Sequence, residues 1–376
     1  MKTGHHLLCA LTAALVVVLA VTLIACSSKS PPTTSSTGTQ PVAVKLVFTT
    51  QPVGATAGSP FATQPVVAAV DINGNVAAGP RKMVTLSITG ITADSHISLF
   101  GGTTVMSLNG VFNFKEISID RAGTYTLTAT SSGLTSAVSS PFDITPIQGA
   151  RLVFSKEIVG ASAGSAFATQ PVVTVLDMYG NTVPGATAEV SLSLINITPD
   201  SFEGVLSGVI KVKAVNGVAN FTGLSVDKVG TYTLMATSGG LTPVYSNSFD
   251  ITPGTGVKLF FNTQPLTAAV GSPLTIIPPA IAVLVQDDYG NTATSSSAEI
   301  TLTITPNTGA NGAVLSGVTK IKAVTGAADF EGLSIDKVGT GYTLTATSSG
   351  LKSGVSDPFD ITPPAPVPTS SNATTP

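Results

Sequence analysis

The side chains that could carry out chemistry are few, and their positions exclude most catalytic sites. The chain has three histidines, His5, His6 and His96, and two cysteines, Cys9 and Cys26. Only His96 lies beyond the N-terminal segment, so a Ser-His-Asp triad, a Cys-His pair or a multi-histidine metal site cannot be assembled. A carboxylate pair for glycoside hydrolysis stays open, although the acids are scattered and recur at turns. We expect a protein that is not an enzyme and uses no cofactor, with His96 in an exposed loop or edge strand.

Cys26 is the candidate for a covalent modification. Residues 7–24 form an apolar stretch of 18 residues, which is typical of an export signal or a membrane span. The stretch ends in Leu-Ile-Ala-Cys, and this resembles the lipobox of bacterial lipoproteins. The resemblance implies that residues 1–25 are a signal peptide, that cleavage precedes Cys26, and that Cys26 is then acylated. An uncleaved span with an incidental cysteine is the alternative, and it too anchors the N-terminus in a membrane.

The resemblance to lipoproteins also bears on location. We expect an exported protein that is anchored to the bacterial cell envelope or the outer surface. Enterobacterial lipoproteins that stay at the inner membrane carry Asp after the lipidated Cys, whereas this chain has Ser27. In a cell with two membranes, outer-membrane or outer-surface placement is therefore favoured.

Three Asp-x-x-Gly-Asn segments offer oxygen ligands, at residues 71–75, 177–181 and 287–291. Alternating oxygens would suit calcium, but an EF-hand loop has its Gly at position six, and this spacing differs. We favour a structural interpretation, in which Asp caps the turn through its own backbone while Gly and Asn adopt positive φ. Calcium bridging between neighbouring repeats through Asp143 or Asp250 is a separate hypothesis.

A threefold internal repeat determines the domain organisation. Residues 118–130, 225–237 and 334–347 are copies of one segment, and the tyrosines within them lie 107 and 110 residues apart. Such a period is the length of one small domain. Since each copy is followed by Phe-Asp-Ile-Thr-Pro, we expect repeat one at residues 42–146, repeat two at 147–253 and repeat three at 254–363. A Ser/Thr/Pro-rich tether at residues 26–41 precedes them, and a disordered tail at residues 364–376 follows.

Hydrophobic alternation predicts the fold of each repeat. Apolar and hydroxyl residues alternate at residues 84–88, 190–194 and 300–304, which indicates half-buried antiparallel strands, and no amphipathic helix is evident. About seven such strands in about 105 residues are typical of an immunoglobulin-like sandwich. The fold class we expect is all-β, with three tandem immunoglobulin-like β-sandwich domains. Because neither cysteine lies in a repeat, packing alone must hold each sandwich.

The repeated tyrosines are the candidate structural residues. Each follows an Asp and a Gly at the start of a late strand, which is typical of a tyrosine corner, where the hydroxyl bonds to upstream backbone. Repeat three carries an additional Gly341 directly before its tyrosine, which alters the spacing of that copy. The three residues are Tyr125, Tyr232 and Tyr342.

The composition excludes nucleic acid as a partner. Charged residues make up 10% of the chain, against roughly 25% in an average soluble protein. The net charge of −3 leaves no basic stripe for a phosphate backbone. No Trp is present to form a stacking platform.

The combination of motifs over residues 42–363 resembles the bacterial immunoglobulin-like domains of the invasin and intimin type. A strand runs into Asp-x-x-Gly-Asn, a Gly-Val-Ala-x-Phe turn follows, and then Gly-Thr-Tyr-Thr-Leu-x-Ala-Thr. The resemblance implies a surface-anchored structural stalk or adhesin-like lipoprotein. The alternative is a specific binding module of the envelope, whose loops at one end of a repeat contact a surface glycan or protein. Short connections between repeats predict a rod on the order of 100 Å long.

Overall fold

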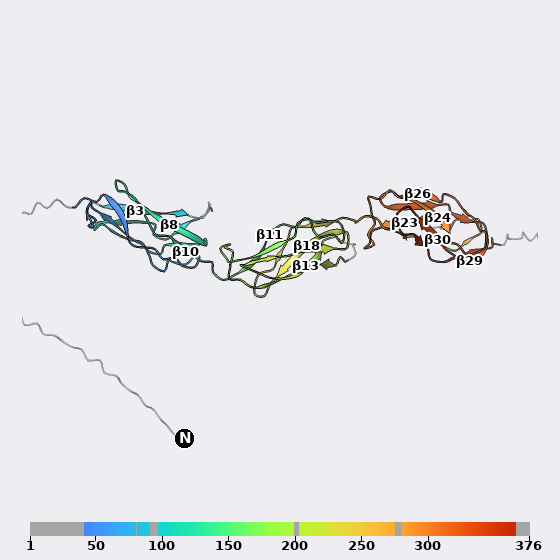
Figure 1. Cartoon of the computed structure of the whole chain (residues 1–376), viewed down its shortest axis with the longest axis horizontal. Coiled ribbons are helices and arrows are strands. Elements are labelled where there is room, and N and C mark those ends of the chain that lie inside the picture. The colour runs from blue at the N-terminus through green and yellow to red at the C-terminus, as the bar shows by residue number, and fades with distance from the viewer. Residues whose placement is uncertain (1–40, 80, 91–96, 199–202, 275–279, 366–376) are drawn as a thin grey trace, which may run out of the picture.

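The computed structural model describes residues 41–79, 81–90, 97–198, 203–274 and 280–365, and every element assigned within them is a β-strand. Figure 1 shows three β-rich units in a row along the longest axis of the molecule. The predicted fold class, all-β with three tandem sandwich domains, is confirmed. Within these ranges no helix has the length and hydrophobicity to cross a lipid bilayer. Cys26, the tether to residue 40 and His96 lie outside the described residues.

Repeat one consists of two facing sheets and a small hairpin. The first sheet has the order β1-β2-β6, and the second has the order β10-β8-β3-β5 with β9 also paired to β8. β4 and β7 form a separate pair. The strands are β1 (Lys45–Thr50), β2 (Val66–Val70), β3 (Lys82–Gly90), β4 (Leu99–Phe100), β5 (Thr104–Ser107), β6 (Val111–Asn113), β7 (Ser118–Ile119), β8 (Gly123–Thr130), β9 (Ala137–Val138) and β10 (Phe142–Ile144).

Repeat two has the same plan. Its sheets have the orders β11-β12-β16 and β15-β13-β18-β19, with β20 also on β18 and β14 paired to β17. The strands are β11 (Arg151–Lys156), β12 (Val172–Leu176), β13 (Glu189–Asn196), β14 (Leu206–Ser207), β15 (Lys211–Lys213), β16 (Val218–Asn220), β17 (Ser225–Val226), β18 (Gly230–Thr237), β19 (Val244–Tyr245) and β20 (Phe249–Ile251).

Repeat three differs where its tyrosine strand is interrupted. Its sheets have the orders β21-β23-β27, β26-β24-β30-β31 and β22-β32-β29, with β25 paired to β28. The strands are β21 (Lys258–Phe261), β22 (Ala268–Ala269), β23 (Ala280–Gln286), β24 (Glu299–Ile304), β25 (Leu315–Ser316), β26 (Lys320–Lys322), β27 (Ala327–Glu331), β28 (Ser334–Ile335), β29 (Gly339–Tyr342), β30 (Leu344–Thr347), β31 (Gly354–Val355) and β32 (Phe359–Thr362).

Each repeat has a core of its own, built from the alternating positions. Tyr232, Leu234 and Ala236 of β18 are fully buried, while the residues between them are partly exposed. A sheet with one face packed on the core and the other face exposed to solvent produces this pattern. The buried side chains form three separate clusters, one per repeat. The phenylalanines that follow the turn before the tyrosine strand fill these cores, since Phe114, Phe221 and Phe330 are buried.

Candidate docking sites between the repeats

The Asp-x-x-Gly-Asn segments are closed turns, which we call docking turns. In each turn one carboxylate oxygen of the Asp accepts hydrogen bonds from the N–H groups two and four residues later, at 2.9 Å. The Gly has positive φ, between 83° and 88° in the three copies. The Asp and Gly therefore have their predicted roles. The prediction for the Asn was wrong, since none of the three has positive φ.

The Asn of repeats two and three reaches across to the preceding repeat. Asn181 Oδ1 accepts from the Ala122 N–H at 2.9 Å, and Asn181 Nδ2 donates to the Asp120 carbonyl at 2.9 Å. The second junction repeats this pair of bonds, in which Asn291 contacts Val229 N at 3.2 Å and the Asp227 carbonyl at 2.9 Å. Both Asn side chains are buried. The Asn thus serves as a connector between repeats.

The Tyr in the middle of the turn makes the second contact. The Tyr179 ring packs against the core of repeat one, and it lies over Gly58 so closely that a Cβ there would collide with it. Tyr289 lies over Gly164 in the same way, although 44% of its surface remains exposed. Both glycines have positive φ, 76° and 74°. Gly is needed here for the backbone conformation and for the space that the ring occupies.

A cation of the preceding repeat makes the third contact. Arg121 Nη1 donates to the Tyr179 carbonyl at 2.6 Å, and Lys228 Nζ donates to the Tyr289 carbonyl at 2.7 Å. Bonds with an ionised donor are stronger than neutral ones. We call the receiving residues the socket; they are Gly58 with Asp120, Arg121 and Ala122 in repeat one, and Gly164 with Asp227, Lys228 and Val229 in repeat two.

The linker makes the fourth contact. The N–H of Ile147 donates to Asp177 Oδ2 at 3.2 Å, and the N–H of Gly254 donates to Asp287 Oδ2 at 3.0 Å. Burial of Asp287 would raise the pKa of its carboxyl group. The hydrogen bonds from the Asn291 side chain and from three backbone N–H groups outweigh this effect and lower the pKa below its ordinary value. The charged carboxylate is therefore the form that the junction stabilises.

The three corner tyrosines support the sockets. The hydroxyls of Tyr125, Tyr232 and Tyr342 donate to backbone carbonyls upstream, at 3.0, 3.1 and 2.9 Å. The accepting residues are Arg121 and Lys228, which supply the cations of the two sockets, and Lys337 at the corresponding position of repeat three. Burial, together with the negative charge of Asp227, raises the pKa of Tyr232, so its hydroxyl stays a donor.

The additional residue in repeat three is accommodated as a bulge. The pairing of β29 with β32 shifts register between Gly339 and Tyr342, and Gly341 has φ of 69° with its N–H on Asp360 Oδ1 at 2.8 Å. A bulge places an extra residue in one strand opposite a single residue of its partner. The Tyr342 hydroxyl bond is consequently kept.

The side chains considered for calcium are engaged in other bonds. Asp143 Oδ1 accepts from Thr124 Oγ1 at 2.6 Å, and Asp250 Oδ1 accepts from Thr231 Oγ1 at 2.7 Å. The Asp177 carboxylate accepts four hydrogen bonds at the junction. The four donors on Asp177 occupy its carboxylate lone pairs, whereas the bonds to Asp143 and Asp250 each engage one of the two carboxylate oxygens. The described residues contain no group of three or more His, Cys, Asp or Glu that could hold a metal ion.

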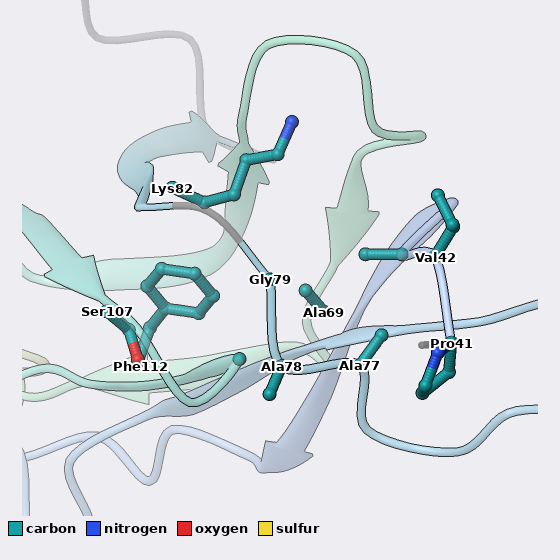
Figure 2. A pocket seen from close by; sticks show the side chains of 11 residues that line it. Pro41, Val42, Ala69, Ala77, Ala78, Gly79, Lys82, Ser107 and Phe112 are labelled. Carbon is teal, nitrogen blue, oxygen red and sulfur yellow. The ribbon is translucent and has the colours of Figure 1, made fainter. Parts of the chain in front are cut away.

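An apolar cavity of about 230 Å³ lies at the end of repeat one where the chain enters it. Figure 2 shows Val42, Ala69 and Ala77 around it, with Phe112 at its side and Lys82 near its rim. Ala69 occupies the position of Val175 and Val285 in the other repeats, so the missing methyl groups explain the space. Lys82 and Ser107 are the polar side chains of its lining, and the other lining residues are apolar or glycine.

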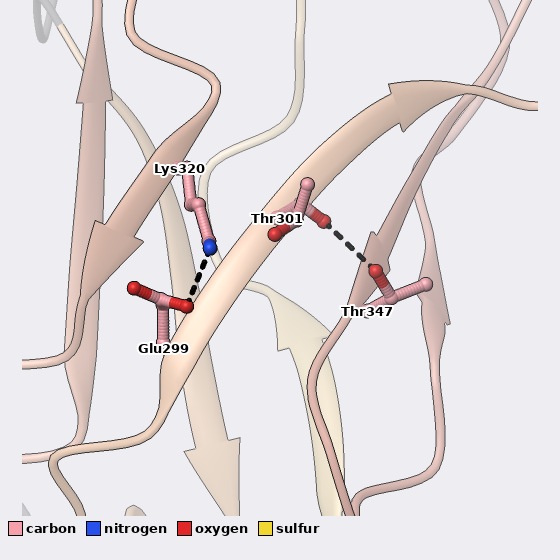
Figure 3. A network of polar contacts seen from close by, with 4 residues as sticks. All are labelled: Glu299, Thr301, Lys320 and Thr347. Atoms are coloured by element: carbon pink, nitrogen blue, oxygen red, sulfur yellow. Dashed lines mark hydrogen bonds and ion pairs between the residues drawn. The ribbon is translucent and has the colours of Figure 1, made fainter.

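The sheet edges carry the other polar cluster. Figure 3 shows Lys320 of edge strand β26 with Glu299 of β24, at an N–O distance of 2.7 Å, and Thr347 Oγ1 donating to the Thr301 carbonyl at 3.4 Å. Both charged side chains are at least half exposed, so the pair contributes little stability. Lysines on an edge strand discourage pairing with foreign strands, and the cluster has this simple explanation.

Sequence reasoning identified the docking turns but missed what they do. A signal was available, because the third turn residue is Tyr in repeats two and three and Asn73 in repeat one. Only repeats two and three have a preceding repeat to contact. The socket glycines were missed, although a signal was available, because Gly58 and Gly164 lie in the nearly identical segments 57–67 and 163–173.

No family model and no curated protein matches the sequence. Among solved structures, the chain is similar to the Escherichia coli adhesin FdeC, with 15% identity and a TM-score of 0.36 over 86% of this chain and 98% of that one. It is similar to InvD of Yersinia pseudotuberculosis, with 15% identity and a TM-score of 0.34 over 84% and 96%. It is also similar to invasin, a bacterial integrin-binding protein, with 13% identity and a TM-score of 0.28 over 86% of this chain and 60% of that one. Likeness at these values does not assign a function or a partner to this chain.

Proposed function

We propose that the chain is a surface-anchored stalk or adhesin-like lipoprotein, non-catalytic, built from repeats at residues 42–146, 147–253 and 254–363. The observation that carries this proposal is the duplicated docking contact. Two junctions use the same turn, the same socket and the same linker bond. Contacts of this kind fix neighbouring domains relative to each other, whereas flexible linkers leave them free. A stiff row of sandwich domains suits a protein that projects its outer repeat away from its membrane anchor.

The proposal places the lipid anchor on Cys26 and the structural corner on Tyr125, Tyr232 and Tyr342. The lipobox-like sequence supports the first assignment, and the hydroxyl bonds to the sockets support the second. A single N-terminal anchor followed by a polar tether would leave repeat three farthest from the membrane. The partner that the proposal allows is a surface glycan or protein, with no role for nucleic acid.

Small-angle scattering tests the stalk. A rod of about 100 Å has a radius of gyration of about 30 Å, whereas a compact chain of this size would have about 20 Å. We expect the larger value for residues 40–363. The smaller value would contradict a stalk.

Mass spectrometry and fractionation test the anchor separately. The wild-type protein should be found in the membrane fraction with an acylated N-terminus. The Cys26→Ser variant should keep its signal peptide and carry no lipid. If the wild-type protein and the Cys26→Ser variant differ in mass by the substitution alone, the lipid anchor is removed from the proposal. The proposed rod would be unaffected by that result.

A further inference from the structure

Repeat three retains a socket that no described residue occupies. Gly271 has φ of 73°, and its N–H donates to the Ile335 carbonyl at 2.9 Å. Gly58 and Gly164 make the same bond, to the Ile119 and Val226 carbonyls, at 2.9 and 2.8 Å. A Cβ at Gly271 would have nothing within 4 Å, whereas at the other two it would collide with a tyrosine ring. The backbone of the third socket is therefore formed, and its surface is open.

The polar groups of the third socket are also present and unused. Val338 and Asp336 correspond to the residues whose N–H and carbonyl hold the connecting Asn in the other sockets. Among the described residues, no hydrogen bond uses the Val338 N–H or the Asp336 carbonyl. Lys337 Nζ donates to the Asn311 carbonyl of its own repeat, at 3.0 Å, while its counterparts donate to a docked turn. Val338 is 47% exposed.

We propose that the outer end of repeat three is a docking site for another protein, whose immunoglobulin-like repeat presents an Asp-x-Tyr-Gly-Asn turn. The occupant follows from the two filled sockets, where Tyr covers the Gly and Asn bonds the backbone. Lys337 would leave Asn311 and donate to the carbonyl of the incoming Tyr. The site would continue the stalk with a repeat from a second protein.

A second copy of this chain fits the socket less well. Its free docking turn is residues 71–75, which has Asn73 in place of Tyr and is exposed over four of its five residues. Asn75 Nδ2 has a weaker bond to Asp71 Oδ2, at 3.4 Å against 2.9 Å in the other turns. This turn has the connector Asn and lacks the ring. A comparison of the wild-type turn with one that carries Asn73→Tyr is therefore a direct test.

The hydrogen bond from the linker N–H to the Asp of the docking turn would be missing when separate chains dock. Residues Ile147 and Gly254 follow the closing Pro of repeats one and two, and Pro364, in the same position, has no N–H to donate. Docking within one chain also benefits from a high effective concentration. The affinity between chains should consequently be weak, and a method that detects millimolar binding is required.

NMR titration provides that method. The sample is residues 40–376 of the wild-type chain, with ¹⁵N-labelled Gly, Val and Lys. The unlabelled probe, which we call the ring probe, is the same chain with Asn73→Tyr and with Lys337→Glu, which disables the probe's own socket. The control probe has Lys337→Glu alone. Both changes are at exposed side chains, so the probe keeps its fold.

Addition of the ring probe to about 1 mM should shift the amide signals of Gly271, Lys337 and Val338, and the control probe should shift them far less. Labelled samples that carry Lys337→Glu or Gly271→Ala should bind the ring probe at least about tenfold more weakly than the labelled wild type. Lys337→Glu reverses the charge of the donor, and Gly271→Ala fills the space that the tyrosine ring would occupy. Unchanged amide signals at about 1 mM would overturn the proposal. Equal shifts with the control probe would also overturn it, because a second copy would then dock without the ring.

Discussion

At the scale of single residues, Asn181 and Asn291 combine two tasks in one amide. The Nδ2 group of each donates to the Asp of its own turn and to a carbonyl of the preceding repeat, while Oδ1 accepts a backbone N–H there. Asp has no donor, and Gln would place its amide one methylene farther out. Asn is therefore the residue that can close a turn and join two domains at once.

We predict that Asn181→Ala weakens the first junction by about 1–3 kcal/mol. The substitution removes the two inter-repeat bonds, which the Asp120 carbonyl and the Ala122 N–H of repeat one make with the Asn181 side chain. The measurement is the unfolding free energy of residues 40–363 together with the radius of gyration. Asn75→Ala is the matched control, because Asn75 is exposed and has no preceding repeat to contact. Equal losses in both variants would contradict the connector role.

Asp287 gives the second junction a predicted pH dependence. Because its pKa is lowered in the folded protein, the carboxylate contributes stability above its unfolded pKa, and this contribution is lost as pH falls through the folded value. The ordinary pKa is about 4, so the melting temperature should fall as the pH is lowered from about 5. Calorimetry on wild type and Asp287→Asn checks this prediction. The variant should be less stable at pH 7 and should show a smaller decrease in acid.

Tyr232→Phe should destabilise repeat two by about 1–2 kcal/mol. The fully buried ring stays in place, but the hydrogen bond from the tyrosine hydroxyl to the Lys228 carbonyl is lost. Denaturant unfolding measures the loss. Tyr245→Phe is the control, since Tyr245 is 60% exposed and should change stability by less than about 0.5 kcal/mol.

At the scale of elements, the socket is a loop whose shape is determined before anything docks. The loop between β17 and β18 is held by the Tyr232 hydroxyl, and the segment around Gly164 is held by its N–H bond to Val226. The corresponding bonds are present in repeat three, where the socket is open. A preformed site loses little conformational freedom when it is filled, and this favours stiff junctions.

Gly164→Ala and Gly271→Ala should separate backbone strain from docking. Both positions have φ near 74°, so the strain in a non-glycine residue, about 1–2 kcal/mol, should be alike. Only at Gly164 would the new methyl group meet a Tyr289 ring. We expect Gly164→Ala to lose more stability and to increase flexibility between repeats two and three in scattering experiments. If both variants behave alike, Tyr289 does not hold the junction.

At the scale of the whole molecule, stability and shape have different origins. Each repeat folds around its own cluster of buried side chains, and the junctions consist of a few hydrogen bonds and one tyrosine ring each. The cores should therefore survive substitutions that loosen the rod. Relative motion of neighbouring domains is the default unless their interface holds them, so loss of these contacts should loosen the rod.

Removal of divalent cations should leave the rod unchanged. The junction carboxylates already accept hydrogen bonds from backbone and side-chain donors, and these need no ion. We expect the same melting temperature and radius of gyration with chelator and with added calcium. A rise in melting temperature with calcium would support the separate hypothesis that an ion bridges the repeats through Asp143 or Asp250.

The fold and the places of the turns follow from the sequence, because both are local properties. Strand alternation depends on residues two apart, and the Asp-x-x-Gly-Asn turn is closed by bonds within five residues. The sequence by itself therefore determined three sandwiches with a docking turn in each. The contacts of Asn181 with Asp120, and of Tyr179 with Gly58, join residues far apart in the chain, and nothing in local pattern relates them. Only the tertiary structure decided that these turns join the repeats, since it is the packing of one repeat on the next that brings the partners together.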